Sequence, residues 1–565
     1  MSAADVPPRS SAGAAARSLA GGISCLADVV RVQARLRPDA IALECGGERR
    51  TFGELRERSA RVASALGAEL DAVPTSRTAR ATAPGDSNPD EAGSSSQPRI
   101  AVLARNSLPI LELTFGAAMR NAVAIQLNWR LAPPEIAQIL ADSEARLLVV
   151  GEEFAPVVER IEHELAHVRT VLVIGEHPRW ASYEAWLEQH PPDDPGVVGG
   201  ADDVALQLYT SGTTGLPKGV MLTNDNVFGA LARVNEWWKF DPSDSVNLAL
   251  MPLFHIAGLA WSVLGLTFGC RTVVLPDVDV DAILDALRGG VTHAFMVPAV
   301  IQFLLAAPGV TREDFASLRL LVYGASPISV SVLTKALEVI GCELVQVYGL
   351  TETTGAVTQL LSTEHDPVGR PDLLRSCGKP FPWVEVRIVE PDTGSDIEGT
   401  GEGAVGELWI RSRQVMAGYW HNPAATHAAI TPEGWLRTGD AGYRDAEGFL
   451  YLYDRVKDMI VTGGENVYPA EVENALMAHP DVADVAVVGV PDERWGEAVK
   501  AVVVPVPTAQ PDPAVLVAFC HERLAGYKCP KSIDFADSLP RNPSGKLLKR
   551  EIRRPYWQGS DRFIG

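Results

Sequence analysis

Residues 209–219 read YTSGTTGLPKG and continue an apolar strand, VALQLY. Glycines let a backbone approach a polyphosphate, while hydroxyls, free amides and a lysine ammonium bind its oxygens. This is not a Walker A loop, because Pro217 stands where that motif needs a glycine followed by lysine. A Gly/Ser/Thr loop alone is often a solvated turn, but this length and composition predict a phosphate-binding loop. Its expected nucleotide-binding residues are Thr210, Ser211, Gly212, Thr213, Thr214, Gly215 and Lys218.

On the N-terminal side of this loop, short apolar segments alternate with amphipathic ones. We expect strands at 100–104, 122–126 and 145–150 and helices at 107–120 and 133–142. This alternation is typical of an α/β fold with a largely parallel, doubly wound sheet. Ligands in such sheets lie at the carboxyl ends of the strands. Thr51 and Glu54 form a capping-box pattern at the start of a further predicted helix.

The composition restricts the class of protein. The chain has 565 residues, 46% hydrophobic and 21% charged, so it can bury cores in more than one domain. A net charge of −21 argues against a nucleic-acid partner. Seven cysteines form no CxxC pair, and Arg17 interrupts the apolar start, so we expect a cytoplasmic protein. The uncharged stretch 245–270 contains Pro252, His255 and three glycines, which favours a buried strand and helix over a transmembrane segment.

Low-complexity stretches and one composition shift divide the chain. Residues 1–23 predict a disordered tail, and residues 75–98 predict a disordered insertion. Near 454–464, charge and paired glycines follow an aromatic segment, and a separate pattern begins. It predicts helices near 469–478 and 513–524 and strands near 482–490 and 498–504. We therefore predict a large N-terminal domain over 24–456 and a smaller α+β domain over 457–565.

Further motifs follow the phosphate loop in a fixed order. They are PLFHIAG at 252–258, YGASP at 323–327, YGLTET at 348–353, GELWIRS at 406–412, WLRTGD at 435–440, DRVKDMIVTGGENVYPAEVE at 454–473 and PRNPSGKLLKR at 540–550. The set resembles the motifs of the adenylate-forming superfamily of acyl-CoA synthetases, luciferases and peptide-synthetase adenylation domains. The resemblance extends from about residue 26 onward. It implies a large AMP-binding domain and a small mobile lid domain.

The resemblance also implies a nucleotide and metal site. Tyr348, Gly349 and Thr351 belong to the segment that holds the adenylate. Glu352 is the expected partner of Thr210 at a Mg²⁺ ion, because carboxylate and hydroxyl oxygens are hard donors. Without the surrounding motif, the expected interpretation of Glu352 would be a solvated surface carboxylate.

Three further segments are implied to contact the nucleotide. The strip along adenine is implied at Gly324, Ala325 and Ser326. A nucleophile elbow at Ser326 is excluded, because Ile328 stands where G-x-S-x-G requires glycine. Asp440 is implied to accept the ribose hydroxyls, and Arg455 to reach ribose or phosphate. The alternative for both residues is an ordinary surface salt bridge.

Two residues are implied to act in catalysis beside Glu352. Lys546 follows a Pro-Ser-Gly turn and resembles the catalytic lysine, whose ammonium would stabilise charge that develops on the phosphoryl oxygens. His255 matches an aromatic gate beside the acyl site, although a lone histidine in an apolar segment is more often a satisfied core residue. Lys457 is implied by the resemblance to occupy the hinge position between the two domains. The implied CoA-binding residues are Gly464, Glu465 and Trp495.

The implied activity is ATP-dependent ligation of a carboxylic acid to CoA through acyl-AMP, with Mg²⁺ as cofactor. ENVYPAEVE and RLAGYKCPK resemble fatty acyl-CoA synthetases and favour a medium- or long-chain acid, but an aromatic or steroid side-chain acid would use the same machinery. An enzyme that loads a carrier protein would share every adenylation residue. A luciferase-like monooxygenase would need oxygen, and a non-enzymatic module would have lost Lys546 or Glu352. Peripheral membrane contact and a homodimer remain open.

Overall fold

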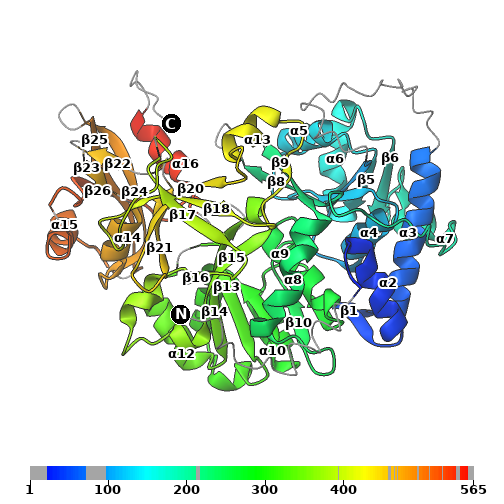
Figure 1. The fold of residues 1–565 in the computed structure, drawn as a ribbon, viewed down its shortest axis with the longest axis horizontal. Helices are drawn as coiled ribbons and strands as arrows, with labels where there is room; N and C mark the ends of the chain where they lie inside the picture. The colour runs from blue at the N-terminus through cyan, green and yellow to red at the C-terminus, as the bar shows by residue number, and fades with distance from the viewer. Residues whose placement is uncertain are drawn as a thin grey trace, which may run out of the picture.

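The computed structural model describes residues 22–71, 97–211, 217–326, 328–391, 393–455, 458, 460–462, 465–467, 469–492, 496–507, 509–524, 526–541 and 547–557. Nearly all of the predicted tail and nearly all of the predicted insertion lie outside these residues. Figure 1 shows a large N-terminal domain, blue to yellow, and a smaller C-terminal domain in orange and red. The seven cysteines all lie in the described residues and form no disulfide bond with one another.

A five-stranded parallel sheet, in the order β4-β3-β5-β6-β7, forms one layer of the large domain. Its strands are β3 (Arg99–Leu103), β4 (Val123–Gln126), β5 (Leu147–Gly151), β6 (Thr170–Ile174) and β7 (Ala181–Ser182). One face packs against α3 (Phe52–Asp71), α4 (Leu108–Met119) and α7 (Tyr183–Glu188), and the other against α5 (Pro133–Ser143) and α6 (Ala155–Ile161). Helices on both faces confirm the predicted doubly wound arrangement.

A nine-stranded sheet forms the second layer, in the order β16-β15-β14-β13-β12-β10-β11-β1-β2. The strands are β1 (Ile41–Cys45), β2 (Glu48–Thr51), β10 (Val246–Ala249), β11 (Arg271–Val274), β12 (His293–Met296), β13 (Leu320–Gly324), β14 (Glu343–Leu350), β15 (Gly355–Leu360) and β16 (Lys379–Pro380). Its interior is parallel, but β2 pairs antiparallel with β1 at one edge, and β15 pairs antiparallel with both β14 and β16 at the other. Helices α8 (Asn224–Trp238), α10 (Val280–Arg288), α11 (Pro298–Ala306) and α12 (Val330–Val339) contribute to its hydrophobic core, whereas α2 (Leu26–Leu36) belongs to the core of the first layer.

Helix α9 (Ile256–Thr267) is buried between these two layers. Leu259 and Val263 belong to the hydrophobic core of the first layer, whereas Trp261 and Leu264 belong to the core of the second. A helix that is apolar all round needs this double burial. The strand and helix expected within 245–270 are therefore confirmed as β10 and α9. Across the described residues, every helix is too short or too polar to cross a membrane.

Two antiparallel sheets complete the large domain, and neither was predicted. The three-stranded sheet β19-β9-β8 contains β8 (Val204–Ser211), β9 (Pro217–Thr223) and β19 (Gly418–Tyr419), and α13 (Pro423–Ala429) follows β19. The four-stranded sheet contains β17 (Glu385–Val389), β18 (Gly406–Arg411), β20 (Leu436–Arg444) and β21 (Leu450–Arg455). The phosphate-loop motif therefore connects two strands of a hairpin.

The smaller domain has the predicted α+β pattern. Its strands are β22 (Ile460–Thr462), β23 (Glu465–Val467), β24 (Val482–Asp492), β25 (Gly496–Pro505) and β26 (Ser532–Phe535), and its helices are α14 (Pro469–Met477), α15 (Pro513–His521) and α16 (Lys549–Arg553). Every residue of its two hydrophobic clusters comes from position 460 or later. The boundary between residues 456 and 457 stays a prediction.

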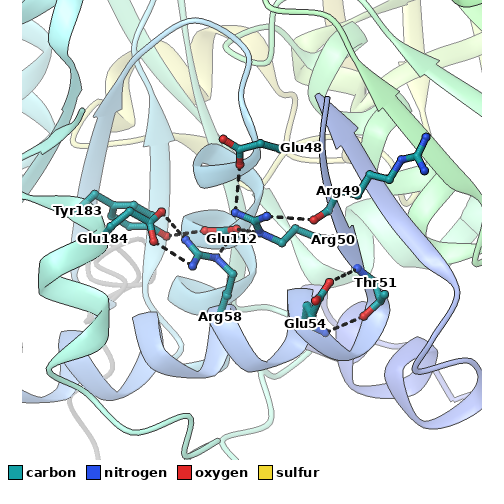
Figure 2. A network of polar contacts seen from close by, with 9 residues as sticks. All are labelled: Glu48, Arg49, Arg50, Thr51, Glu54, Arg58, Glu112, Tyr183 and Glu184. Atoms are coloured by element: carbon teal, nitrogen blue, oxygen red, sulfur yellow. Dashed lines mark hydrogen bonds and ion pairs between the residues drawn. The ribbon is translucent and has the colours of Figure 1, made fainter. Parts of the chain in front are cut away.

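A buried carboxylate joins several N-terminal elements (Figure 2). The Glu112 side chain on α4 is fully buried, and its Oε1 accepts hydrogen bonds from Arg58 Nε at 2.6 Å and Arg50 Nε at 3.4 Å. The Tyr183 phenol donates to Glu112 Oε2 at 3.0 Å, and Arg58 also donates to Glu184. Burial, followed by the charge of Glu112, holds the pKa of Tyr183 well above its usual value. The network connects α3, α4, α7 and β2.

Figure 2 also shows the start of α3. The Thr51 amide donates to Glu54 Oε2 at 2.7 Å, and the Glu54 amide donates to Thr51 Oγ1 at 3.1 Å. These reciprocal bonds satisfy two amides that have no partner inside the helix. The capping box predicted from the sequence is confirmed.

Candidate active site

The phosphate-loop hairpin presents two polar side chains on one face. In the register of β8 and β9, Thr210 lies directly opposite Lys218. Directly opposed residues of antiparallel strands point to the same face, so the Thr210 hydroxyl and the Lys218 ammonium share it. Residues 212–216 and the side chain of Ser211 lie outside the described residues. The roles expected of Gly212, Thr213, Thr214 and Gly215 therefore stay predictions.

Strand β19 brings a tyrosine to that same face. Tyr419 lies opposite Val220, which is two residues beyond Lys218 on β9. Lys218 Nζ lies 5.0 Å from the centroid of the Tyr419 ring, within the range of a cation–π contact. The Tyr419 phenol donates a hydrogen bond to Glu352 Oε1 at 2.9 Å. Lys218 and Glu352 thus meet at one ring that the sequence did not single out, and Thr210 lies across from Lys218 on β8.

The turn that carries Glu352 is fixed by its backbone. It is a short 3₁₀ segment, Thr351–Thr353, directly after β14. The Leu350 amide donates to Thr353 Oγ1 at 2.8 Å, and the Met416 amide donates to the Glu352 carbonyl oxygen at 2.9 Å. These bonds fix the backbone of Glu352, and the phenol of Tyr419 then orients its carboxylate.

A buried phenol–carboxylate pair joins two of the predicted nucleotide segments. Tyr348 on β14 donates to Asp440 Oδ2 on β20 at 2.7 Å, and Asp440 is only 8% exposed. Burial, followed by the charge of Asp440, holds the pKa of Tyr348 well above its usual value. Asp440 lies opposite Arg455 in the register of β20 and β21, although the side chain of Arg455 is outside the described residues. The surface alternative for Asp440 is therefore wrong.

The predicted adenine strip lies at the end of β13, beside the Tyr348 segment. Gly324 pairs with Val347 in the parallel register of β13 and β14. A Cβ atom at Gly324 would collide with the Val347 carbonyl oxygen. Ala325 has a φ of 67°, a left-handed conformation that is uncommon for residues other than glycine, and Ser326 follows it. Similarly, a Cβ atom at Gly349 would collide with a backbone carbonyl oxygen of β15. These segments meet at the carboxyl ends of parallel strands, where ligands are expected.

His255 directly precedes α9 and has an unsatisfied ring nitrogen. Its ring centroid lies 4.7 Å from that of Phe254. Its Nε2 atom is buried and has no hydrogen-bond partner among the described residues. Burial, followed by the charge of Arg130, lowers the pKa of His255 to about 4, so the ring is neutral near pH 7. The alternative of a satisfied core histidine does not fit; His293, with both ring nitrogens bonded, is one.

The remaining predicted residues cannot be placed in the site. Lys546, Lys457, Gly464 and Trp495 lie outside the described residues, as does the side chain of Glu465. Their catalytic, hinge and CoA-binding roles stay predictions. Among the described residues, the structure adds Tyr419, which the sequence-based interpretation had missed.

Two family models match the chain. A model described as AMP-binding enzyme matches residues 90–420, and a model described as AMP-binding enzyme C-terminal domain matches residues 471–546. The first match spans more than half of the chain. The chain therefore belongs to the AMP-binding enzyme family, within the adenylate-forming superfamily.

Individual relatives agree with this assignment. A fatty acid–[acyl-carrier-protein] ligase, ScoC of Streptomyces coeruleorubidus, is 39% identical over 547 residues, covering 96% of this chain and 98% of that protein. A feruloyl-CoA synthase from an Amycolatopsis species is 37% identical, covering 93% and 97%. The crystal structure of ATP-bound MatB from Rhodopseudomonas palustris superimposes with a TM-score of 0.81 at 29% identity, covering 93% of this chain and 99% of that one. The chain is an adenylate-forming ligase with the fold of this family.

Proposed function

We propose that this ligase joins a medium- or long-chain fatty acid to CoA through an acyl-AMP intermediate. The observation that best supports the proposal is the hydrogen bond between Tyr348 and Asp440, which unites two predicted nucleotide segments 92 residues apart. It brings a buried carboxylate close to the predicted adenine strip, which supports the ribose-binding role proposed for Asp440.

In the first half-reaction, a carboxylate oxygen of the acid attacks the α-phosphorus of ATP. The bond from that phosphorus to the bridging oxygen breaks, and pyrophosphate leaves. Thr210 and Lys218 face the phosphates, and Asp440 accepts the ribose hydroxyls. Lys546 would stabilise the charge that develops on the phosphoryl oxygens, which is the largest single contribution that such a site can make.

The residues around Tyr419 fit a Mg²⁺ ion. Glu352 Oε1 accepts the hydrogen bond of the Tyr419 phenol, while Oε2 accepts no hydrogen bond from the described residues. Thr210, which lies on β8 opposite Lys218, adds a hydroxyl oxygen. Mg²⁺ is commonly held by one or two carboxylates together with substrate phosphates, so this donor set is sufficient. When bound, the ion neutralises charge on the phosphate oxygens.

In the second half-reaction, the CoA sulfur attacks the acyl carbon, the bond to the AMP oxygen breaks, and AMP leaves. The small domain would rotate at Lys457 and bring Gly464, Glu465 and Trp495 to the CoA. His255, neutral near pH 7, would border the acyl group without placing a charge beside it. A neutral wall suits an apolar acid.

The relatives suggest one alternative to the proposed acid and one alternative to the proposed acceptor. The relative named for fatty acid and acyl-carrier-protein supports the fatty acid, and it equally favours a carrier protein as the acceptor. The relative named for feruloyl-CoA favours an aromatic acid. Loading of a carrier protein is therefore the second candidate function.

A panel of acids assayed for AMP release decides among these functions. Saturated acids of increasing length are compared with aromatic acids, each with free CoA or with a phosphopantetheinyl carrier protein. We expect the greatest AMP release with free CoA and a medium- or long-chain acid. AMP release only with the carrier protein would show that the acceptor is the carrier protein and not CoA. A preference for aromatic acids would show that the substrate is not a fatty acid. Failure of every acid to support exchange of pyrophosphate into ATP would reject the proposal.

A further inference from the structure

The segment 416–420 connects the metal-binding carboxylate to the phosphate-loop hairpin. At one end, the Met416 amide donates to the Glu352 carbonyl oxygen at 2.9 Å. In the middle, β19 pairs with β9. At the other end, the Trp420 amide donates to the Gly219 carbonyl oxygen at 2.7 Å. Residues that are far apart in sequence are thus held in one register.

The backbone of this segment does not depend on the Tyr419 hydroxyl. Trp420 Nε1 donates to the Asp142 carbonyl oxygen at 3.0 Å, and the Arg99 guanidinium lies 3.5 Å from the centroid of the Trp420 ring. The Tyr419 amide donates to Thr426 Oγ1 at 2.9 Å. A change confined to the phenol oxygen therefore leaves the segment in place and alters only what that oxygen touches.

That oxygen touches the Glu352 carboxylate, while the ring touches Lys218. The phenol donates to Oε1, which leaves Oε2 for another ligand. The ring face lies 5.0 Å from Lys218 Nζ and offers the ammonium a cation–π contact. The Tyr419 side chain therefore orients the Glu352 carboxylate through its hydroxyl and the Lys218 ammonium through its ring.

We propose that Tyr419 is the positioning residue of the metal site: its hydroxyl orients Glu352 toward the ion, and its ring orients Lys218 toward the phosphates. This inference rests on the proposed function, because it assumes that Glu352 holds the metal of a metal–nucleotide complex. Removing a hydrogen-bonding partner of a metal ligand typically lowers metal affinity about 10- to 100-fold. Tyr419 is such a partner of Glu352.

Two variants separate the two contacts. Tyr419→Phe removes the hydroxyl and keeps the ring, whereas Tyr419→Leu removes both. The matched control is Tyr556→Phe, since that phenol donates to Asp534 Oδ2 at 2.6 Å in the small domain, away from this segment. Binding of Mn²⁺ is followed by electron paramagnetic resonance with an ATP analogue that has a methylene group between the α- and β-phosphorus atoms. Binding of the same analogue is also measured without metal.

We expect Tyr419→Phe to weaken Mn²⁺ binding on the order of 10-fold, with metal-free binding of the analogue unchanged. Pyrophosphate exchange by this variant should recover at high Mg²⁺. Tyr419→Leu should in addition weaken metal-free binding about 2- to 5-fold, because Lys218 loses its aromatic contact. Tyr556→Phe should match the wild type in every measurement.

Each other outcome has a distinct meaning. Wild-type affinity for Mn²⁺ in Tyr419→Phe, or equal losses with and without metal, would overturn the inference while leaving the proposed function intact. An equal loss in Tyr556→Phe would show a general effect of phenol removal and would likewise overturn it. A wild-type protein that binds no Mn²⁺ with the analogue would reject the proposed metal site itself.

Discussion

Replacing Glu112 by alanine should destabilise the large domain by about 3–5 kcal/mol, the cost of removing one partner of a buried ion pair. The Glu112 side chain is 0% exposed, and the Arg58 side chain that it pairs with is 19% exposed. Without the carboxylate, Arg58 and Arg50 would lose their shared acceptor, and the buried Tyr183 phenol would lose its partner. Because Arg58 keeps its bonds to Glu184, we expect the lower end of that range.

Two control variants test the cause of this loss. Glu184 pairs with the same Arg58, but its side chain is 54% exposed, so Glu184→Ala should cost at most about 1 kcal/mol. Glu112→Gln keeps an acceptor oxygen and removes the charge, so its cost should lie between the other two. This order follows from burial, because all three changes affect one guanidinium.

Urea unfolding followed by tryptophan fluorescence measures the three costs, since the free energy of unfolding falls linearly with urea. The midpoint of the large-domain transition should fall most for Glu112→Ala and least for Glu184→Ala. If Glu112→Ala costs no more than Glu184→Ala, the network shown in Figure 2 does not hold α3, α4 and α7 together, and the reasoning from burial is wrong.

Three further predictions concern the site and its surroundings. Tyr348→Phe should raise the KM for ATP about 10-fold and leave that for the acid unchanged, because Asp440 loses a hydrogen bond worth about 1.5 kcal/mol; pyrophosphate exchange measures both, and an equal rise in the two would contradict it. Lys546→Ala should lower adenylation on the order of 10²-fold, while thioester formation from supplied acyl-AMP persists; similar losses in both steps would refute the role. Burial lowers the pKa of both His255 and His293 to about 4. As the pH falls below about 6.5, these histidines become protonated in the unfolded chain but stay neutral in the folded protein until about pH 4. The free energy of unfolding should therefore fall between about pH 6.5 and 4, by up to about 3 kcal/mol per residue. Urea midpoints measured across this range should decline less in a His293→Gln variant.

Features fixed by neighbouring residues could be predicted from the sequence. The Thr51–Glu54 capping box needs only residues three positions apart, and the structure contains both of its bonds. The alternation of strands and helices from β3 to β5, and again from α14 to α15, follows from local apolar periodicity. The adenine strip was implied by resemblance alone and stays a prediction; the structure shows that its first residue, Gly324, ends a parallel strand, where ligands are expected.

Features that depend on distant pairing could not be predicted. Strand β19 has two residues, too few for any periodic pattern, and its partner β9 lies about two hundred positions earlier. The contact of Tyr419 with Glu352 spans 67 positions. Glu112 interrupts an otherwise apolar helix and suggests a solvent-facing position, yet it is fully buried, because its arginine partners come from β2 and α3. Each of these contacts exists only after the layers have assembled.

The placement of Tyr419 between Lys218 and Glu352 has a physical advantage. The described residues contain no ion pair between that lysine and that carboxylate; the phenol satisfies one carboxylate oxygen, and the ring face attracts the ammonium. A direct ammonium–carboxylate pair would have to break before phosphates and metal could replace it, because each charge would then be engaged by the other. A neutral aromatic partner contacts each charge without neutralising it. In the proposed function, the lysine therefore remains available to phosphate, and the carboxylate to the cation that accompanies it.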